Sequence, residues 1–183
     1  MNKAVFLDRD GTILKDCDYL SNPDHIRVYK GVIPALKNLK KKGWRLVIGT
    51  NQSGIGRGYF TVKEMEKVHR RLFSIFKKDG LVMDMVVFCP HGPNDGCDCR
   101  KPGQGMIRKA AKRFNLDLEQ CVAVGDKESD ILWGKRAGAR TVLVLTGSGR
   151  KVRDARRVKP DYVARSLSYA VKWILKNGND RAK

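Results

Sequence analysis

Short apolar runs alternate with amphipathic helical patterns along the chain, and this alternation restricts the fold more than any other feature of the sequence. Each run is nearly uninterrupted by polar residues, which is typical of parallel strands covered by helices on both faces. Thr61 and Glu64 have the spacing of a capping box at the start of one helical pattern. The predicted strands are 4–7, 45–49, 85–88, 121–124 and 141–145, and the predicted helices are 31–42, 65–76, 104–114, 128–137 and 167–175.

These patterns predict an α/β fold, a Rossmann-like three-layer sandwich with a mainly parallel sheet. The chain has 183 residues, of which 42% are hydrophobic, enough for one core and too few for a second large domain. We expect a single domain over residues 1–176 and a frayed tail over residues 177–183. Ligands bind beyond the carboxyl ends of strands in such sheets. We therefore expect the chemistry to follow Leu7, Gly49, Phe88 and Val124.

The chain is strongly basic. It carries 38 Lys and Arg against 19 Asp and Glu, a formal charge of +19, and this excess attracts polyanions such as nucleic acid, anionic lipid or phosphorylated metabolites. We interpret the densest basic segment, residues 150–159, as a solvated surface. Because aromatic residues are not interleaved with the bases, the sequence does not predict a stacking platform for single strands. Nucleic acid is not an expected partner, although the charge is compatible with one.

The sequence also indicates a compartment. No apolar run approaches the roughly 18 residues that a membrane span needs, and Asp8, Arg9 and Asp10 interrupt the first apolar stretch, which argues against a secretory signal. We therefore expect a cytoplasmic protein with no membrane partner. In a reducing compartment, the five cysteines predict metal ligands or core thiols rather than disulfides.

Acidic and polar side chains follow the predicted strands at the edge where the strand ends meet. Carboxylates suit a hard cation such as Mg²⁺. Magnesium with a lysine beside it is what phosphoryl transfer requires, because positive groups offset the repulsion between an anionic nucleophile and a phosphate. The chain lacks the Gly-Lys-Ser/Thr sequence of a Walker loop, which excludes a standard ATP site of that kind. The groups are Asp8, Asp10, Thr50, Asn51, Gln52, Ser53, Lys101 and Asp126.

Four short motifs in this order resemble those of the haloacid dehalogenase-like (HAD-like) phosphatases. One motif alone is weak evidence, whereas four in the right order after successive strands are specific. The resemblance implies a HAD-like fold and a phosphoric monoester hydrolase. Since the chain has no insertion large enough for a cap domain, we expect an open site. The motifs are Asp8-Arg9-Asp10-Gly11-Thr12, Thr50, Lys101 and Gly125-Asp126.

The resemblance assigns a role to each matching residue. Asp8 would be the nucleophile that forms an aspartyl-phosphate, and Asp10 would act as general acid and then as general base. Thr50 and Lys101 would hold the phosphoryl oxygens. The implied cofactor is catalytic Mg²⁺, bound by Asp8, the backbone carbonyl of Asp10, and Asp126.

A second constellation consists of Cys89, His91, Cys97 and Cys99. Three thiolates and one imidazole suit a tetrahedral Zn²⁺, and two cysteines separated by one residue are poorly placed to form a disulfide with each other. Glycine and proline leave the loop little core of its own, so we expect a structural zinc to fix the zinc-binding loop, residues 89–99. Cys121, at the start of a predicted strand, is expected to be a small buried residue.

This loop resembles that of two phosphatase families, one acting on D-glycero-D-manno-heptose 1,7-bisphosphate and the other on histidinol phosphate. Residues 50–60 and 101–106 resemble the heptose family, whereas the short gap between His91 and Cys97 is like that of the histidinol enzymes. The heptose resemblance implies removal of the C7 phosphate in the biosynthesis of nucleotide-activated heptose. We also expect a monomer, since an open single domain with polar helix faces is compatible with one. Arg100, a forked donor, would meet the retained C1 phosphate. The implied substrate-binding residues are Asp16, Cys17, Asp18, Tyr19, Asn51, Gln52, Ser53, Arg100 and Lys127.

Three alternatives to the heptose function follow from the same residues. One is a histidinol-phosphatase, and another is a polynucleotide 3′-phosphatase, since that group shares the aspartate chemistry and this chain is basic. The third is a nucleic-acid-binding protein without turnover, against which the complete set of Asp8, Asp10, Lys101 and Asp126 argues.

Three further residues have weaker assignments. Asp130 would lie behind the metal ligands, or would serve only as an acid that favours the start of a helix. His25 is predicted in a solvated loop and His69 on a solvated helix face, and neither is a predicted catalytic residue.

Overall fold

A six-stranded sheet forms the centre of the molecule in the computed structural model, which describes residues 2–178. The strand order is β3-β2-β1-β4-β5-β6, and every pairing is parallel. The chain therefore starts in the interior of the sheet and winds outwards in both directions. This confirms the predicted fold class. The strands are β1 (Ala4–Leu7), β2 (Arg45–Asn51), β3 (Met85–Cys89), β4 (Val122–Gly125), β5 (Arg140–Val144) and β6 (Tyr162–Ala164).

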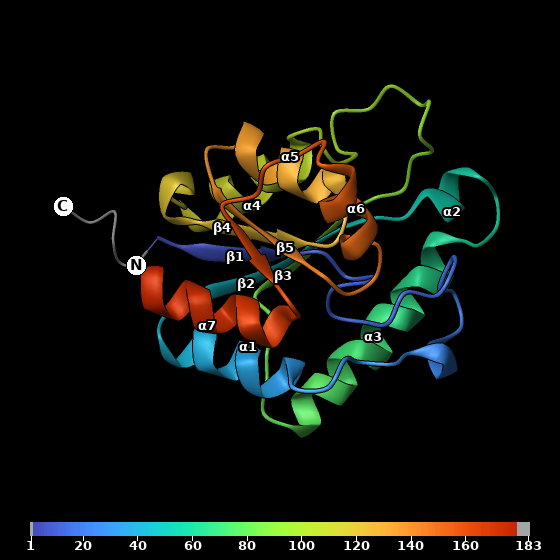
Figure 1. Cartoon of the computed structure of the whole chain (residues 1–183). Helices are drawn as coiled ribbons and strands as arrows, with labels where there is room; N and C mark the ends of the chain where they lie inside the picture. The colour runs from blue at the N-terminus through green and yellow to red at the C-terminus, as the bar shows by residue number, and fades with distance from the viewer. Residues whose placement is uncertain (1, 179–183) are drawn as a thin grey trace.

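Helices cover both faces of the sheet (Figure 1). Alternate side chains of β1 serve two cores, because successive residues of a strand point to opposite faces. Val5 and Leu7 pack with α1, α3 and α7, whereas Ala4 and Phe6 pack with α4 and α5. Burial on both faces explains why the strands are almost wholly apolar. The helices are α1 (Val32–Lys41), α2 (Ser53–Gly56), α3 (Val62–Lys78), α4 (Gly105–Phe114), α5 (Glu128–Arg136), α6 (Gly149–Ala155) and α7 (Leu167–Asn177), with short 3-10 turns at Pro23–His25 and Leu118–Gln120.

The predicted capping box starts α3. The Glu64 backbone N–H donates to Thr61 Oγ1 at 3.2 Å, and the Thr61 N–H donates to Glu64 Oε2 at 2.7 Å. Two backbone N–H groups at the helix start, which have no carbonyl partner within the helix, are thus hydrogen-bonded to side chains. The apolar stripe that follows is buried, as predicted, and it places α3 against the sheet.

Several boundaries differ from the prediction, and the helices α2 and α6, the strand β6 and both 3-10 turns were not predicted. β2 runs two residues beyond the predicted end, to Asn51, and α7 reaches Asn177, the first residue of the predicted tail. Residues 179–183 of that tail lie outside the described residues. α6 falls in the basic segment that we interpreted as solvated surface, and β6 is a three-residue strand at the edge of the sheet. No helix within residues 2–178 is long and apolar enough to cross a membrane.

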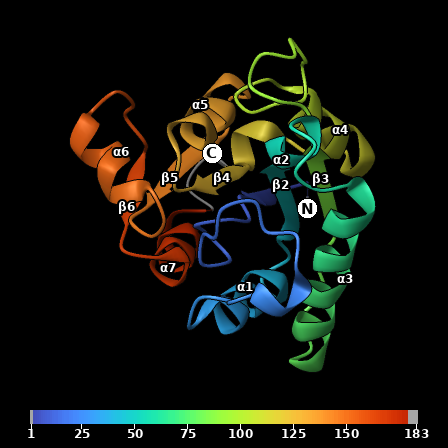
Figure 2. The same cartoon turned by 90° about the vertical axis from the view of Figure 1, so that its right-hand side faces the viewer.

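The carboxyl ends of all strands lie at one edge of the sheet, which faces the viewer in Figure 2. The segment after β1 crosses the centre of this view, with α2 and α3 on one side and α6 and α7 on the other. The segment contains only short local structure, the 3-10 turn Pro23–His25 and the bridges Asp10–Leu14 and Leu14–Val28. This edge is where the sequence predicts the chemistry.

Candidate active site

The strand order brings the predicted catalytic residues together. Leu7, the last residue of β1, pairs with Ile48 of β2 and Val124 of β4, and the Asp8 N–H donates to the Val124 carbonyl at 2.9 Å. Asp8 is therefore flanked by the ends of both neighbouring strands. Asp8, Thr50 and Asp126 are all buried. The expected convergence of these side chains is present.

Three buried carboxylates form the centre of the site. Asp8, Asp126 and Asp130 each place one carboxylate oxygen within 4.8 Å of the corresponding oxygens of the other two. Burial raises the pKa of Asp8 to about 6, with Lys101 lowering it and Asp130 raising it. Burial and the neighbouring Asp8 and Asp130 charges raise the pKa of Asp126 to about 8. Within residues 2–178, no group donates a hydrogen bond to the buried Asp8 Oδ2. An unpaired buried oxygen beside a second carboxylate fits a divalent cation.

Lys101 supplies the balancing positive charge. Its Nζ lies 2.6 Å from Asp8 Oδ1, 2.6 Å from Asp130 Oδ1 and 2.8 Å from the Gly49 carbonyl. Burial alone would lower the pKa of Lys101, but the carboxylates of Asp130 and Asp8 raise it above its ordinary value. Asp130 Oδ2 accepts from the Lys127 N–H at 2.9 Å. Both oxygens of Asp130 are therefore engaged within the protein, and Asp130 orients Lys101.

The turn that follows β1 passes directly against the Asp126 carboxylate. Gly11 adopts a φ of +88°, and a Cβ atom there would collide with the Asp126 carboxylate, so this position requires glycine. The Ser148 N–H donates to Asp126 Oδ2 at 2.7 Å, and Thr12 Oγ1 lies 3.5 Å from Oδ1. The contact from Ser148 was not predicted, because it comes from the loop after β5, where the sequence indicated no site.

Asp10 lies beside this cluster and is held by neighbours that were not predicted. The guanidinium of Arg9, which is fully buried, donates to both carboxylate oxygens of Asp10 at 2.9–3.1 Å. The prediction of a solvated His69 is wrong, since only 5% of this residue is exposed and its Nε2 lies 2.9 Å from Arg9 Nη1. A signal for this burial was present, because residue 69 follows Met65 by four and precedes Leu72 by three, which places it on the apolar stripe of α3.

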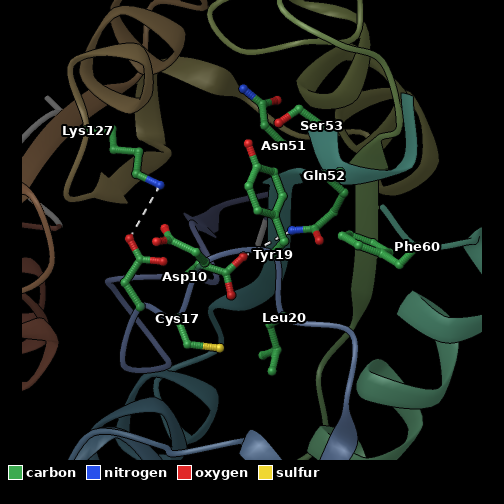
Figure 3. A pocket seen from close by; sticks show the side chains of 12 residues that line it. Asp10, Cys17, Tyr19, Leu20, Asn51, Gln52, Ser53, Phe60 and Lys127 are labelled. Carbon is green, nitrogen blue, oxygen red and sulfur yellow. Dashed lines mark hydrogen bonds and ion pairs between the residues drawn. The ribbon is translucent and has the colours of Figure 1, made fainter. Parts of the chain in front are cut away.

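A polar cavity of about 210 Å³ opens beside Asp10 (Figure 3). Lys127 and Asp16 approach across it, with 3.8 Å between Nζ and Oδ2. Tyr19 has a φ of +54°, and its ring packs edge-on against Tyr59 at a centroid distance of 4.7 Å. The structure gathers eight of the nine predicted substrate-binding residues around this cavity. Its lining is Asp10, Asp16, Cys17, Asp18, Tyr19, Asn51, Gln52, Ser53 and Lys127, with Leu20, Gly54 and Phe60 as additions that were not predicted.

Asn51 and Arg100 have contacts that their predicted roles do not explain. The Asn51 side chain accepts from the Lys101 N–H at 2.9 Å and donates to the Lys101 carbonyl at 3.2 Å, so it fixes the backbone that carries the buried lysine. Arg100 does not line the cavity. Its Nη1 donates to the His91 carbonyl at 3.2 Å, within the zinc-binding loop.

The four predicted zinc ligands converge. The Sγ atoms of Cys89 and Cys97 are 3.6 Å apart, those of Cys97 and Cys99 are 3.5 Å apart, and His91 Nδ1 lies 3.2 Å from Cys99 Sγ and 3.6 Å from Cys89 Sγ. Tetrahedral Zn²⁺, with Zn–S bonds of about 2.3 Å, separates its ligands by roughly 3.5–3.8 Å. All five cysteines are free thiols. The donor set and its spacing therefore fit zinc.

Comparison with known proteins shows the family. The HAD-hydrolase-like family model matches residues 98–170. The D-glycero-β-D-manno-heptose-1,7-bisphosphate 7-phosphatase of Helicobacter pylori is 45% identical over 145 residues, covering 79% of this chain and 84% of the relative. The enzyme of the same name from Haemophilus ducreyi is 40% identical over 179 residues, covering 94% of this chain and 98% of the relative.

A solved structure extends the similarity to the fold. The crystal structure of D,D-heptose 1,7-bisphosphate phosphatase from B. bronchiseptica, complexed with magnesium and phosphate, superposes with a TM-score of 0.91 and is 35% identical. The match covers 97% of this chain and 99% of that chain. Elements beyond the family-model match, including β1 and β2, therefore have counterparts in that structure.

Proposed function

This chain belongs to the HAD-like family of heptose 1,7-bisphosphate 7-phosphatases, and we propose that it removes the C7 phosphate of D-glycero-β-D-manno-heptose 1,7-bisphosphate. The observation that carries the proposal is the buried Asp8, which has one oxygen on Lys101 and the other unpaired beside Asp126. The β anomer is proposed because the names of the two relatives specify it. The identities of these relatives do not favour the histidinol, polynucleotide or binding-only alternatives.

The reaction has two steps in this proposal. Asp8 attacks phosphorus to form an aspartyl-phosphate, while Asp10 gives its proton to the leaving 7-oxygen of the sugar. Asp10 then takes a proton from the water that attacks the aspartyl-phosphate, which releases inorganic phosphate and restores Asp8. Thr50 and Lys101 hold the phosphoryl oxygens in both steps. Asp8, Asp126 and the Asp10 carbonyl would hold the magnesium ion, which when bound would offset the repulsion between Asp8 and the phosphate.

The cavity beside Asp10 supports a sugar substrate. Its lining offers the carboxylates of Asp16 and Asp18 and the hydroxyl of Ser53 as partners for hydroxyl groups. Lys127 is the cation at its wall. Arg100 remains the proposed partner of the C1 phosphate. Because Arg100 donates to the His91 carbonyl, the position of its guanidinium depends on the fold of the zinc-binding loop.

Phosphate release with magnesium tests the function directly. The substrates are both anomers of the heptose bisphosphate, histidinol phosphate and a 3′-phosphorylated oligonucleotide, with Asp8→Asn as the blank. We expect kcat/KM for the β anomer to exceed that for every other substrate by at least about a hundredfold, roughly 2.7 kcal/mol in transition-state binding. Similar slow turnover of all four would reject the heptose assignment and retain only the phosphatase activity.

The zinc-binding loop is expected to hold one structural zinc per chain. Replacing Cys97 with Ser should lower the bound zinc after dialysis from about one ion to below about 0.2 per chain, because three ligands bind the ion much more weakly than four. The Tm should fall with it. Cys17→Ser is the matched control, since Cys17 is a free thiol outside the cluster. Elemental analysis that finds zinc unchanged in Cys97→Ser would exclude this site.

Magnesium is expected to stabilise the protein more at about pH 8.5 than at about pH 6. The pKa of Asp126 is raised to about 8 and that of Asp8 to about 6, chiefly by burial. Such groups contribute stability that is complete below their unfolded pKa, near 3.8, and is lost as the pH rises through the folded value. Because magnesium binds the ionised carboxylates, it offsets most of this loss at high pH. Thermal melts with and without magnesium measure the effect, and equal Tm increments at the two pH values would contradict it.

A further inference from the structure

Arg9 is a fully buried cation that lies between the two proposed catalytic aspartates in sequence and has no part in the mechanism above. Its guanidinium donates to the Asp10 carboxylate through two nitrogen atoms. Nε donates to Asp10 Oδ1 at 3.0 Å and to Oδ2 at 3.1 Å, and Nη2 donates to Oδ2 at 2.9 Å. Burying a guanidinium is costly unless the charge is paired and hydrogen-bonded. The contacts with Asp10 provide one side of that compensation.

The other side of the guanidinium is held by His69, which α3 contributes from 60 residues further along the chain. Arg9 Nη1 lies 2.9 Å from His69 Nε2. Because a guanidinium has only donors, Nε2 must be the accepting nitrogen of a neutral imidazole. The environment agrees, since burial and the charge of Arg9 lower the pKa of His69 to about 3. The His69 ring therefore fixes the direction of the Arg9 fork.

Gln52 closes the network at the edge of the cavity. Its Oε1 accepts from Arg9 Nη2 at 3.0 Å, and its Nε2 donates to Asp10 Oδ2 at 3.0 Å and to Thr50 Oγ1 at 2.8 Å. Figure 3 shows the Gln52 side chain reaching towards Asp10. Both amide hydrogens are thus used within the protein. The Asp10 carboxylate is held from two directions and has little freedom to rotate.

General charge compensation of the acidic cluster does not explain this arrangement. Lys101 already lies between Asp8 and Asp130, at 2.6 Å from each. The hydrogen bonds of Arg9 to carboxylates go to Asp10. A group that transfers a proton to a leaving oxygen must be held in a narrow range of positions. Directional contacts on Asp10 serve that need, whereas a diffuse positive charge would not.

We propose that Arg9 is a positioning residue, held by His69 and Gln52, that fixes the Asp10 carboxylate for proton transfer to the leaving oxygen. The inference rests on the proposed function, because the role of Asp10 belongs to that proposal. His69 is the distal support, and its effect on the reaction passes through Arg9. Losing the acceptor at residue 69 should release the guanidinium and let the Asp10 carboxylate rotate, while Asp8, Lys101 and Asp126 remain in place.

The leaving group of the substrate separates this role from a merely structural one. An alkyl oxygen such as the 7-oxygen of a sugar needs a proton as it departs, whereas a nitrophenolate departs well without one. The ratio kcat/KM includes only the steps up to the first irreversible one, here formation of the aspartyl-phosphate, so it isolates the protonation by Asp10. A variant with a misplaced Asp10 should therefore lose activity on the sugar phosphate and keep it on the aryl phosphate.

The experiment compares His69→Phe with His69→Gln on heptose bisphosphate and 4-nitrophenyl phosphate. Phe has no acceptor but suits the apolar stripe, where His69 already stacks on Phe73, and Gln retains an acceptor. We expect His69→Phe to lower kcat/KM by about 10- to 100-fold on the sugar phosphate and by less than about threefold on the aryl phosphate. His69→Gln should stay within about threefold of the parent on both. His25→Phe, at an exposed histidine, is the control.

Each outcome has a defined meaning. An equal loss on both substrates, or no loss on either, would overturn the positioning role of Arg9 and His69. Failure of the unsubstituted chain to hydrolyse either ester with magnesium would instead reject the proposed function, and the inference with it. If His69→Phe does not fold, Arg9→Lys takes its place, because lysine keeps the charge but loses the fork. The same selective loss on the sugar phosphate is then expected, and its absence would overturn the inference.

Discussion

Replacing Asp8 with Asn should abolish turnover while leaving the metal-free protein at least as stable as the parent at about pH 8. Loss of the nucleophile should lower kcat by at least about 10⁴-fold, a typical cost of removing the attacking group. Stability should not fall, because burial raises the pKa of Asp8 to about 6, so ionisation at pH 8 costs free energy in the folded state. Asn removes that charge and its repulsion with Asp126 and Asp130. Lys101 keeps its contacts with Asp130 and the Gly49 carbonyl.

Two measurements check this prediction. Phosphate release gives the loss of turnover, and thermal melts in a magnesium chelator give the stability. Asp24→Asn is the matched control, because Asp24 lies in the exposed 3-10 turn Pro23–His25 and should change neither quantity. Turnover by Asp8→Asn within about tenfold of the parent would exclude Asp8 as nucleophile. A Tm well below that of the parent would show instead that the Asp8–Lys101 ion pair outweighs the cost of burying the charge.

The convergence of the catalytic residues could be predicted from the sequence because it depends on topology. Residues that follow parallel strands must meet at one edge of the sheet. Predicting the strands was therefore enough to predict that Asp8, Thr50 and Asp126 lie close together. A boundary error of one or two residues does not move a residue to the other edge. The zinc ligands could be predicted for a similar reason, since close pairs of ligands within one loop need no long-range information.

Features that depend on tertiary packing could not be predicted in the same way. The sequence showed Arg9 only as a charge that interrupts an apolar stretch. Its contact with His69 could not be predicted, because the two residues are 60 positions apart. The helix α6 has no apolar stripe to mark it, and its sequence is mostly charged. The strand β6 has three residues, and Tyr162 and Val163 are exposed, so alternation could not be detected. The contact of Arg100 with the His91 carbonyl was not predicted either, because it depends on how the zinc-binding loop folds.

Lys101→Met should cost both activity and stability, with the stability loss dependent on pH. Met has a similar length but neither charge nor donors, so Asp8 and Asp130 lose their shared partner. Removing one member of a buried ion pair typically costs about 3–5 kcal/mol, because the remaining charge is left uncompensated. Activity should fall at least about 10³-fold, since Lys101 also holds the phosphoryl oxygens in the proposed reaction. The free energy of unfolding should therefore drop by several kcal/mol at about pH 8.5.

The sign of the pH dependence separates charge compensation from packing. The pKa values of Asp8 and Asp126 are already raised, to about 6 and about 8, with Lys101 in place. Without its positive charge these carboxyls should hold their protons to still higher pH, so the deficit should shrink as the pH falls from about 8.5 towards about 5.5. Denaturant unfolding at both pH values measures it, with Lys109→Met on the exposed face of α4 as the control. A deficit equal at both pH values would mean that Lys101 stabilises the fold by packing alone, and the acidic cluster would then need another source of positive charge.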